Sequence, residues 1–187
     1  VVNGAIDLAS SSTKGRSAQF QGAGDVVLNG MLFGGGAFQF GVIKNATSAD
    51  QTGTLYLNGA NTYNGITQIT GGTLKIGNAQ ALGSTDGGTT LSSPFFSGAT
   101  LDLNGQAVVG ESLSMDGTTA DAVDYGVAVV NSSATPASWS GSVALAGGGS
   151  GIGGTGDITV TGSVTGSGDL RKVGLGSVTL TAAGNTG

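Results

Sequence analysis

The sequence lacks two residue types on which many enzymes and metal sites depend. Its 187 residues contain no cysteine and no histidine. Without cysteine the chain has no disulfide framework and no thiol nucleophile, and without histidine it lacks the commonest general base and metal ligand. Catalysis or metal binding would have to depend on carboxylates, hydroxyls and a few basic side chains.

Charged residues are also scarce. They make up 9% of the chain, the net charge is -5, and the six basic residues form no cluster larger than the pair Arg171 and Lys172. Binding to a phosphate backbone needs several converging cations, so we exclude nucleic acid as a partner. No stretch approaches the roughly 20 apolar residues of a membrane-spanning helix, so we expect no membrane insertion by this segment.

Glycine, by contrast, is abundant, with 38 glycines against two prolines. Such a composition can accompany disorder, but hydrophobic residues make up 38% of the chain, which is enough to build a core. The charged residues are too few to coat exposed helices, whereas strands can present Thr, Ser, Asn and Gln to solvent. We therefore expect an all-β protein with no significant helix.

Short units with an apolar residue at every second position recur along the chain, flanked by Gly, Asn or Thr, and predict very short strands. The units are Ile6–Leu8, Val26–Leu28, Leu55–Leu57, Leu74–Ile76, Leu101–Leu103, Leu113–Met115, Val143–Leu145, Ile158–Val160 and Val178–Leu180. Several begin about 20 residues apart, at 6 and 26, at 55 and 74, and at 158 and 178. A period of this length without helices predicts a solenoid of stacked coils with corner loops of unequal length.

The triplet Leu-Asn-Gly occurs at 28–30, 57–59 and 103–105 and is interpreted as a strand end followed by a corner. In the second copy Leu57 would point inward, and Asn58 and Gly59 would allow the turn because both tolerate positive φ. If Asn29, Asn58 and Asn104 occupy equivalent corners, their side chains would stack and hydrogen-bond along the axis.

One stretch resembles a known family. Residues 53–65, GTLYLNGANTYNG, followed by ITQITGGTLKIGN to residue 78 and ALG at 81–83, resemble the autotransporter-associated β-strand (passenger-associated transport) repeat, which we place at 53–84. A second, partial copy covers 168–187, through GDLRKVGLGSVTL and the final GNTG. Residues 85–167 resemble the family only through GATLDLNG at 98–105.

The resemblance implies a right-handed parallel β-helix, with residues 1–187 forming one segment of a longer passenger domain. It further implies export across the outer membrane by a translocator barrel elsewhere in the parent chain, and a location outside a Gram-negative bacterium, secreted or on the cell surface. The start at Val1 without methionine also leads us to expect an excised or processed segment.

The function that these patterns favour is structural. The segment would be a non-enzymatic stalk or scaffold of an adhesin, assisting export and display, with a host-surface or matrix glycan or protein as a further partner. Two alternatives stay open. One is a non-catalytic part of a carbohydrate-active β-helix enzyme, and the other is a self-assembling extracellular filament or surface-layer component with end-to-end self-association.

Several local patterns are candidate sites. Gly151–Gly156 matches G-x-G-x-x-G, but a dinucleotide site needs a following helix and an acidic residue, so we interpret the run as a flexible corner. Residues 153–157 approach a calcium-binding nonapeptide in a single copy only. Arg171 and Lys172 are adjacent on an expected strand, so their side chains should diverge.

Four carboxylates are close in sequence and have the chemistry for a cation site or an acid and base pair: Glu111, Asp116, Asp121 and Asp124. Their spacing fixes no geometry, and we interpret them as solvating a loop. We therefore predict no catalytic, cofactor-binding or metal-binding residue and no cofactor.

Aromatic and threonine residues give weaker signals. Exposed aromatic rings could stack on sugars, and the candidates are Tyr56, Tyr63, Tyr125 and Trp139. Other aromatic residues are expected to fill or cap the core, namely Phe33, Phe38, Phe40, Phe95 and Phe96. A row of Thr159, Thr161 and Thr179 is similar to ice-binding solenoids, but its spacing is too irregular for a flat lattice match.

Overall fold

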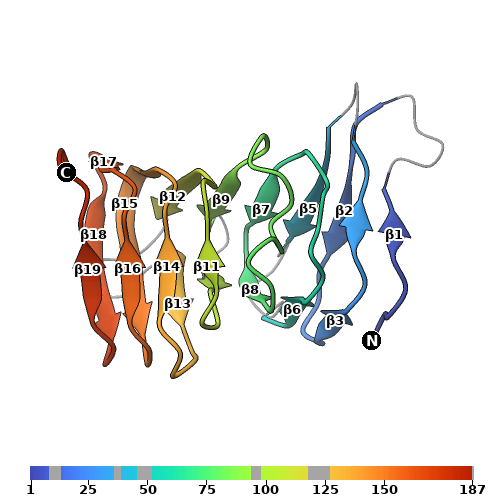
Figure 1. The fold of residues 1–187 in the computed structure, drawn as a ribbon, viewed down its shortest axis with the longest axis horizontal. Helices are drawn as coiled ribbons and strands as arrows, with labels where there is room; N and C mark the ends of the chain where they lie inside the picture. Colours follow the sequence, from blue (N-terminus) through green and yellow to red (C-terminus); the bar gives the residue numbers. More distant parts are fainter. Residues whose placement is uncertain (9–13, 36–38, 46–51, 94–97, 118–126, 187) are drawn as a thin grey trace.

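The chain coils about six times into a parallel β-solenoid, as the computed structural model shows (Figure 1). The structure describes residues 1–8, 14–35, 39–45, 52–93, 98–117 and 127–186. Within these ranges there is no helix, and every strand pairing is parallel. The all-β parallel solenoid predicted from the sequence is confirmed, and its right-handedness stays a prediction.

The strands lie on three faces of the coil, and each face is a stack of strands from successive turns. The first face holds β2 (Arg16–Phe20), β5 (Phe40–Lys44), β7 (Thr67–Ile69), β9 (Thr89–Ser92), β12 (Leu113–Gly117) and β17 (Val164–Gly166). The second face holds β3 (Val26–Leu28), β6 (Thr54–Leu57), β8 (Gly72–Ile76), β10 (Ala99–Asp102), β13 (Val127–Asn131) and β18 (Asp169–Gly174). The third face holds β1 (Ile6–Asp7), β4 (Leu32–Phe33), β11 (Ala107–Val108), β14 (Ala137–Trp139), β16 (Ile158–Val160) and β19 (Val178–Leu180).

One strand joins two faces. β15 (Val143–Gly154) has 12 residues; its first part pairs with β12 and β17, and its second part pairs with β13 and β18. Elsewhere the chain leaves the first face through a corner before it enters the second. The glycines of β15 give a backbone that continues around this bend as a strand.

Alternation of side chains builds the core. In β6 and β8 the inward residues Leu55, Leu57, Leu74 and Ile76 are fully buried, while Tyr56 on the outer side is half-buried. The period of two in the sequence has this result because successive strand residues point to opposite faces. The same pattern along the axis gives one continuous apolar core from Leu28 to Val164.

All nine predicted units coincide with strands, and the strand expected at Arg171 and Lys172 is β18. Nine further strands of the described chain were not predicted. Five of the missed strands lie on the first face, namely β2, β5, β7, β9 and β17, and the inward residues Thr67 of β7 and Thr89 of β9 are polar. The predicted spacing of about 20 residues between stacked strands is correct for two of the three pairs of strand starts. Leu55 pairs with Leu74 and Ile158 with Val178, but Ile6 pairs with Leu32 and not with Val26, because the first turn is longer.

The third face is interrupted near its middle. β1 and β4 form one sheet and β11, β14, β16 and β19 form another. Between them, the Ser84 amide donates to the Tyr63 carbonyl and the Thr62 amide to the Leu32 carbonyl. Among the described residues no backbone hydrogen bond joins 79–85 to 107–111, so two successive coils separate at this place.

Candidate functional site

The asparagines of the Leu-Asn-Gly triplets lie at the corner that follows the second face. The Asn58 side chain donates a 2.8 Å hydrogen bond to Asn29, and the Asn29 side chain donates a 2.7 Å bond to Asn3. At the equivalent position the next coil has Gly77, and Asn104 beyond it bonds to a backbone carbonyl. The stack therefore joins Asn29 and Asn58, and glycine interrupts it before Asn104.

The glycine of the triplet has a different role from the one expected. Positive φ occurs at Asn104 (48°) and Gly105 (77°), but at neither Asn58 nor Gly59. A Cβ on Gly59 would lie 2.5 Å from the backbone oxygen of Gly30. The expectation of positive φ at the second triplet is wrong because the stacked backbones, and not the turn angle, require glycine here.

The buried side-chain amides of Asn61 and Asn131 form hydrogen bonds at other corners. The sequence analysis did not predict this role for either residue. Asn61 is almost fully buried; its Oδ1 accepts from the amide of Leu32 at 2.8 Å, and its Nδ2 donates to the carbonyl of Ala81 at 2.6 Å. It thus joins the coils before and after its own. The available signal was its place in the corner of the repeat.

Asn131 is fully buried and has the same role nearer the C-terminus. Its Oδ1 accepts from the amides of Gly105 and Ser133 at 2.9 and 3.1 Å. Its Nδ2 donates to the carbonyls of Thr135 and Asp157 at 2.9 and 3.0 Å. With every side-chain hydrogen-bonding group paired, this amide is structural and has no group free for chemistry.

A lysine, an aspartate and a serine meet on the outer side of the second face. Lys75 Nζ lies 3.1 Å from Asp102 Oδ2 and 2.7 Å from Ser132 Oγ, and that hydroxyl donates to Asp102 Oδ2 at 2.6 Å. A serine nucleophile needs a base that takes its proton. Here the hydroxyl bonds to a carboxylate that is already paired with the lysine, so the cluster links three coils instead of activating the serine.

Two of the four candidate carboxylates, Glu111 and Asp116, lie in the described part of the chain. Asp121 and Asp124 lie outside the described residues. Asp116 is in strand β12, and Glu111 is buried in the corner after β11, so the interpretation of these two as a solvated loop is wrong. Among the residues that the structure describes, no three Asp or Glu side chains gather to hold a metal ion.

Glu111 is the most perturbed acid in the described chain. Its side chain is 2% exposed, and the Thr89 hydroxyl donates to its Oε1 at 2.8 Å. Burial raises the pKa of Glu111 to about 7, although the hydrogen bond from Thr89 opposes the shift. Burial likewise raises the pKa of the nearby Tyr63 phenol, and the charge of Glu111 adds to this effect.

Lys44 is a second buried ionisable residue that sequence reasoning missed. It is the last residue of β5 and points inward with 2% of its surface exposed, and its ammonium group has no hydrogen-bond partner among the described residues. Burial lowers its pKa. The signal was available, because alternation from Val42 places position 44 on the inner side.

The glycine run at 151–156 lies mostly within a strand. Gly151–Gly154 belongs to β15 and pairs with β13 and β18, so the interpretation of this part as a flexible corner is wrong. In the described chain no helix follows it. Arg171 and Lys172 are exposed on β18, where Lys172 Nζ donates to the Gly174 carbonyl at 2.6 Å and Arg171 lies 4.0 Å from Asp169.

Of the four aromatic residues expected to be exposed, Tyr56 is half-buried on the outer side of β6. Tyr63 and Trp139 are 0% and 1% exposed, so the expectation that they are exposed is wrong, and Tyr125 lies outside the described residues. Tyr63 is buried because its hydroxyl bonds to Thr67 at 2.6 Å inside the corner. Phe40 is buried as expected.

The remaining predicted core aromatics divide into two groups. Phe33 is half-buried at the end of β4. The other three lie outside the described residues, namely Phe38, Phe95 and Phe96.

The threonines singled out in the sequence form no extended row on the described strands of the third face. Thr159 lies opposite Thr179, but the equivalent positions on the earlier strands of the third face are Ser138 and Ala107. Thr161 follows β16 and pairs through its backbone with Trp139. The structure thus offers no regular threonine lattice along its described third face.

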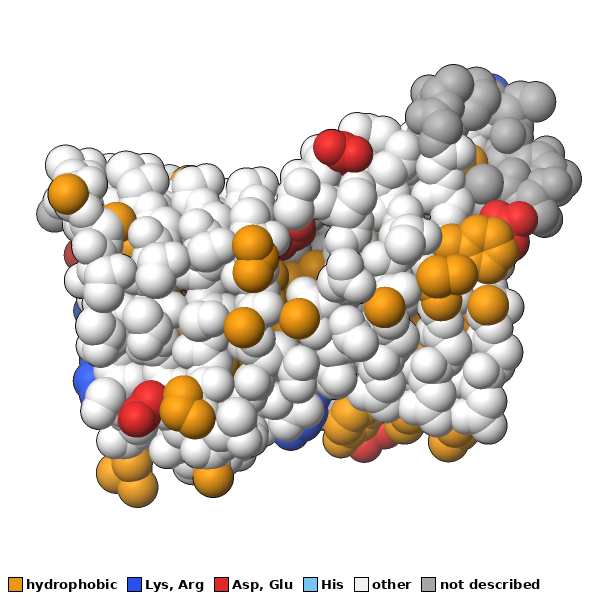
Figure 2. Space-filling view, viewed as in Figure 1, with side chains coloured by type: hydrophobic (Ala, Val, Ile, Leu, Met, Phe, Trp, Pro, Cys, Tyr) orange, Lys and Arg blue, Asp and Glu red, His pale blue; other side chains and the backbone are white. Residues whose placement is uncertain are grey.

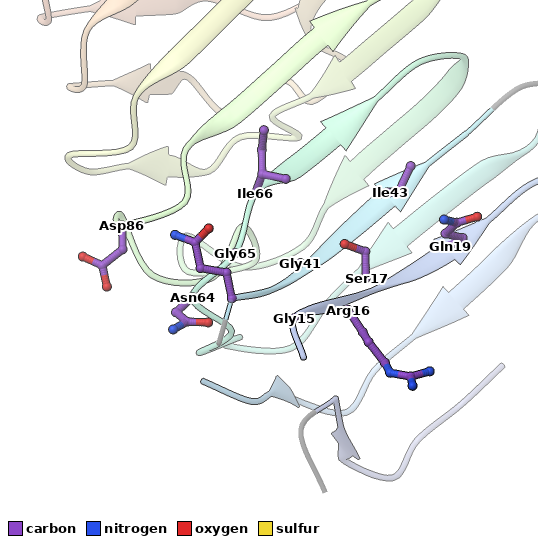
Figure 3. A pocket seen from close by; sticks show the side chains of 11 residues that line it. Gly15, Arg16, Ser17, Gln19, Gly41, Ile43, Asn64, Gly65, Ile66 and Asp86 are labelled. Atoms are coloured by element: carbon purple, nitrogen blue, oxygen red, sulfur yellow. The ribbon is translucent and has the colours of Figure 1, made fainter. Parts of the chain in front are cut away.

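Two grooves open on the surface. The larger, of about 950 Å³, runs over the outer side of β2 and β5 to the corner at 64–66. Figure 3 shows its lining side chains, which are mainly polar and come from separate coils, including Arg16, Gln19, Asn64 and Asp86. The second, of about 570 Å³, lies in the interruption of the third face and is called the third-face groove.

Among the described residues, the third-face groove has one ionisable lining residue. Its lining comprises Ala79, Gln80, Leu82, Gly83, Ser84, Thr85, Ala107, Val108, Val109 and Glu111. Figure 2 shows this face as hollowed near its middle, with apolar and acidic side chains around the hollow. The lining combines apolar residues such as Val109 with the polar side chains of Gln80, Ser84, Thr85 and Glu111. Small-ligand sites commonly combine apolar walls with a few polar groups.

Comparisons with known proteins agree with the repeat seen in the sequence. Residues 50–76 match the family model of the passenger-associated-transport-repeat, which overlaps the copy predicted at 53–84. Searches of curated proteins and of solved structures gave no significant match. In the described ranges no helix is long and apolar enough to cross a membrane. The chain therefore carries a passenger-associated-transport-repeat within a parallel β-solenoid, an arrangement consistent with an autotransporter passenger domain.

Proposed function

We propose that this segment is a structural stalk or scaffold of a secreted, cell-surface adhesin of the autotransporter type. The observation that carries the proposal is the regular stacking of the coils. Parallel ladders and one apolar core continue through the described chain, and the passenger-associated-transport-repeat supplies one of these coils. Each coil adds about 4.8 Å along the axis and contacts only its neighbours, which makes an extended rod.

The surface chemistry supports a role without catalysis. Among the described residues the buried carboxyl groups are Glu111 and Asp102. Asp102 is paired with Lys75 and accepts from the Ser132 hydroxyl, so that hydroxyl is bonded to an ion pair instead of a free base. Glycoside hydrolysis in most families needs a pair of carboxyl groups flanking the scissile bond. The proposed partners are the rest of the parent chain with its translocator barrel and a host-surface or matrix molecule, and the proposed location is the surface of a Gram-negative bacterium.

Deletion of one coil in the intact parent protein tests the proposal. The register pairs Leu55 with Leu74 and Tyr56 with Lys75, so removal of residues 55–73 places Leu74 at the position of Leu55 and keeps inward residues inward. A spacer with one coil fewer should still be displayed and should still support attachment at near-normal levels. Cell-surface labelling and adhesion counts measure the two quantities.

A matched control removes one residue fewer. Deletion of 55–72 places Thr73 at the inward position and turns Leu74 outward, so it should abolish display because a one-residue slip reverses every side chain. Normal display of both deletions would contradict the stacked-coil basis of the proposal. Loss of a glycan-cleaving activity after the 55–73 deletion, with display intact, would favour the enzyme alternative, since small displacements strongly reduce catalysis.

A further inference from the structure

The third-face groove contains a carboxyl group, that of Glu111, with one oxygen to which no described residue donates a hydrogen bond. Glu111 is 2% exposed, and of its two carboxyl oxygens Oε1 accepts the hydrogen bond from Thr89 at 2.8 Å. No described residue bonds to the second oxygen. A buried carboxylate is costly unless it is paired, so a group that donates to this oxygen would gain a strong interaction.

The described part of the protein supplies no cation at this place. Glu111 is the only ionisable residue among the described ones that line the groove. The Thr89 hydroxyl bonds to its carboxyl group, and the Tyr63 phenol lies close enough for the charge of Glu111 to raise the phenol pKa. Neither neighbour carries a positive charge. The whole chain has a net charge of -5, which favours the approach of a cation over that of an anion.

The walls of the groove are suited to an aliphatic chain. Val109 contributes most of the apolar surface, because it is 73% exposed at the corner after β11, whereas Leu82 and Val108 also line the groove but are only 2% and 3% exposed. An alkylammonium group is complementary to both the carboxyl group and the apolar surface of the groove. Its charged end can pair with a carboxylate while its methylene groups cover apolar surface. A volume of about 570 Å³ accommodates such a chain.

We propose that the third-face groove binds a primary alkylammonium group, with the ammonium on Glu111 and the methylene chain against Val108 and Val109. A lysine side chain of a partner polypeptide and a free alkylamine share this chemistry. The proposal is independent of the stalk function, because it depends on the groove alone. Binding should strengthen with rising pH, since only the ionised carboxylate pairs with the cation.

Titration of the isolated segment with two small probes tests the proposal. Nα-acetyl-lysine methylamide carries the ammonium group, and Nα-acetyl-norleucine methylamide has an aliphatic chain without it. We expect the lysine probe to bind and to perturb the NMR signals of Val108, Val109 and Glu111, while the norleucine probe leaves them unchanged. With the Glu111 pKa at about 7, the lysine probe should bind roughly 30-fold more weakly at pH 5.5 than at pH 8.

Matched variants separate the groove from general charge. Glu111→Gln should abolish lysine-probe binding, whereas Asp169→Asn, which removes the same charge at an exposed site on β18, should leave it unchanged. Equal effects of the two variants, equal binding of the two probes, or no binding at millimolar concentration would each overturn the proposal. The pH profile of the unmodified protein gives a further test should Glu111→Gln fold poorly.

A free amine distinguishes the two sources of the alkylammonium group. If n-pentylamine binds as tightly as the lysine probe, the groove recognises the alkylammonium chain alone and free amines suffice. Tighter binding of the lysine probe would support a polypeptide partner. Binding of n-pentylamine with the same affinity in Glu111→Gln would contradict the proposed contact.

Discussion

Two stretches of the second face occupy equivalent places and are held in different ways. Strand β8 lies between β6 and β10, and the second part of β15 lies between β13 and β18, so each has a partner on both sides. β8 buries Leu74 and Ile76 completely, whereas β15 contributes Ile152, 7% exposed, and a buried Ser150. The repeat coil thus supplies much more apolar side chain to the core than the glycine-rich coil.

The glycine-rich coil gains close backbone contact instead. A Cβ on Gly153 would collide with the backbone oxygen of Val173, and one on Gly154 would collide with that of Asn131. The core beside it contains a small space of about 10 Å³ lined by apolar residues that include Ile152 and Trp139. One face of a solenoid can therefore be held either by interlocking side chains or by closely packed backbones.

The largest expected effect concerns the repeat coil. Leu57→Asp should lower the free energy of unfolding by about 4 kcal/mol or more, because it buries an unpaired charge at a fully buried position. Tyr56→Asp on the outer side should cost about 1 kcal/mol or less. Urea denaturation of the two variants measures both losses, and equal losses would refute the assigned side-chain alternation of β6.

Alanine substitutions in β8 and in the second part of β15 should lower the free energy of unfolding by amounts that differ less than those of the two variants in β6. Leu74→Ala should cost about 3 kcal/mol, because it leaves a cavity in a closely packed part of the core. Ile152→Ala should cost about 2 kcal/mol, since Ile152 already borders unfilled space and is less completely buried. Chemical denaturation midpoints provide the measurement. A larger cost at Ile152 than at Leu74 would show that the glycine-rich coil depends on side-chain packing after all.

The next prediction concerns Glu111, which lies at the interruption of the third face, and the pH dependence of the free energy of unfolding. The pKa of Glu111 rises from 4.5 in the unfolded chain to about 7 in the folded protein, so the folded state binds the proton more tightly. The stability contributed by protonated Glu111 is complete below pH 4.5 and is lost as pH rises through 7. From pH 5.5 to pH 7.5 the free energy of unfolding should fall by about 2 kcal/mol.

Glu111→Gln should remove this decrease, and Asp169→Asn should retain it. Thermal denaturation of the three proteins at several pH values provides the comparison. An unchanged decrease in Glu111→Gln would assign the effect to another group.

Prediction from the sequence succeeded for β6, whose inward residues are leucines, and failed for β7 and β9, which each have an inward threonine. It also missed β13, although its inward Val127 and Val129 are apolar. Leu55 and Leu57 were placed inward correctly because few alternatives compete with burying leucine. Thr67 and Thr89 are also buried, but their hydroxyls bond to the Leu82 carbonyl and to Glu111, partners that come from other coils. Which residues become such partners depends on how the coils are paired, and this pairing could not be derived from the sequence alone.

The candidate site was less predictable than the fold for the same reason. Glu111 was selected only as a neighbour of Asp116 in sequence, whereas its place in the groove depends on the separation of residues 79–85 from 107–111. Tyr63 looked exposed because no period marked its corner as an inner one. The resemblance to the passenger-associated transport repeat located the repeat coil. It gave no information on the interruption of the third face between residues 79–85 and 107–111.

The register of the strands also has a kinetic consequence. Paired strands such as β3 and β6, or β6 and β8, are separated by roughly 20 to 30 residues along the chain, so no pairing requires the two ends of the molecule to meet. Closing each new loop costs nearly the same entropy as closing the one before it. A folded coil can then act as a template for the next, and folding can advance one turn at a time while the rest of the chain is still extended.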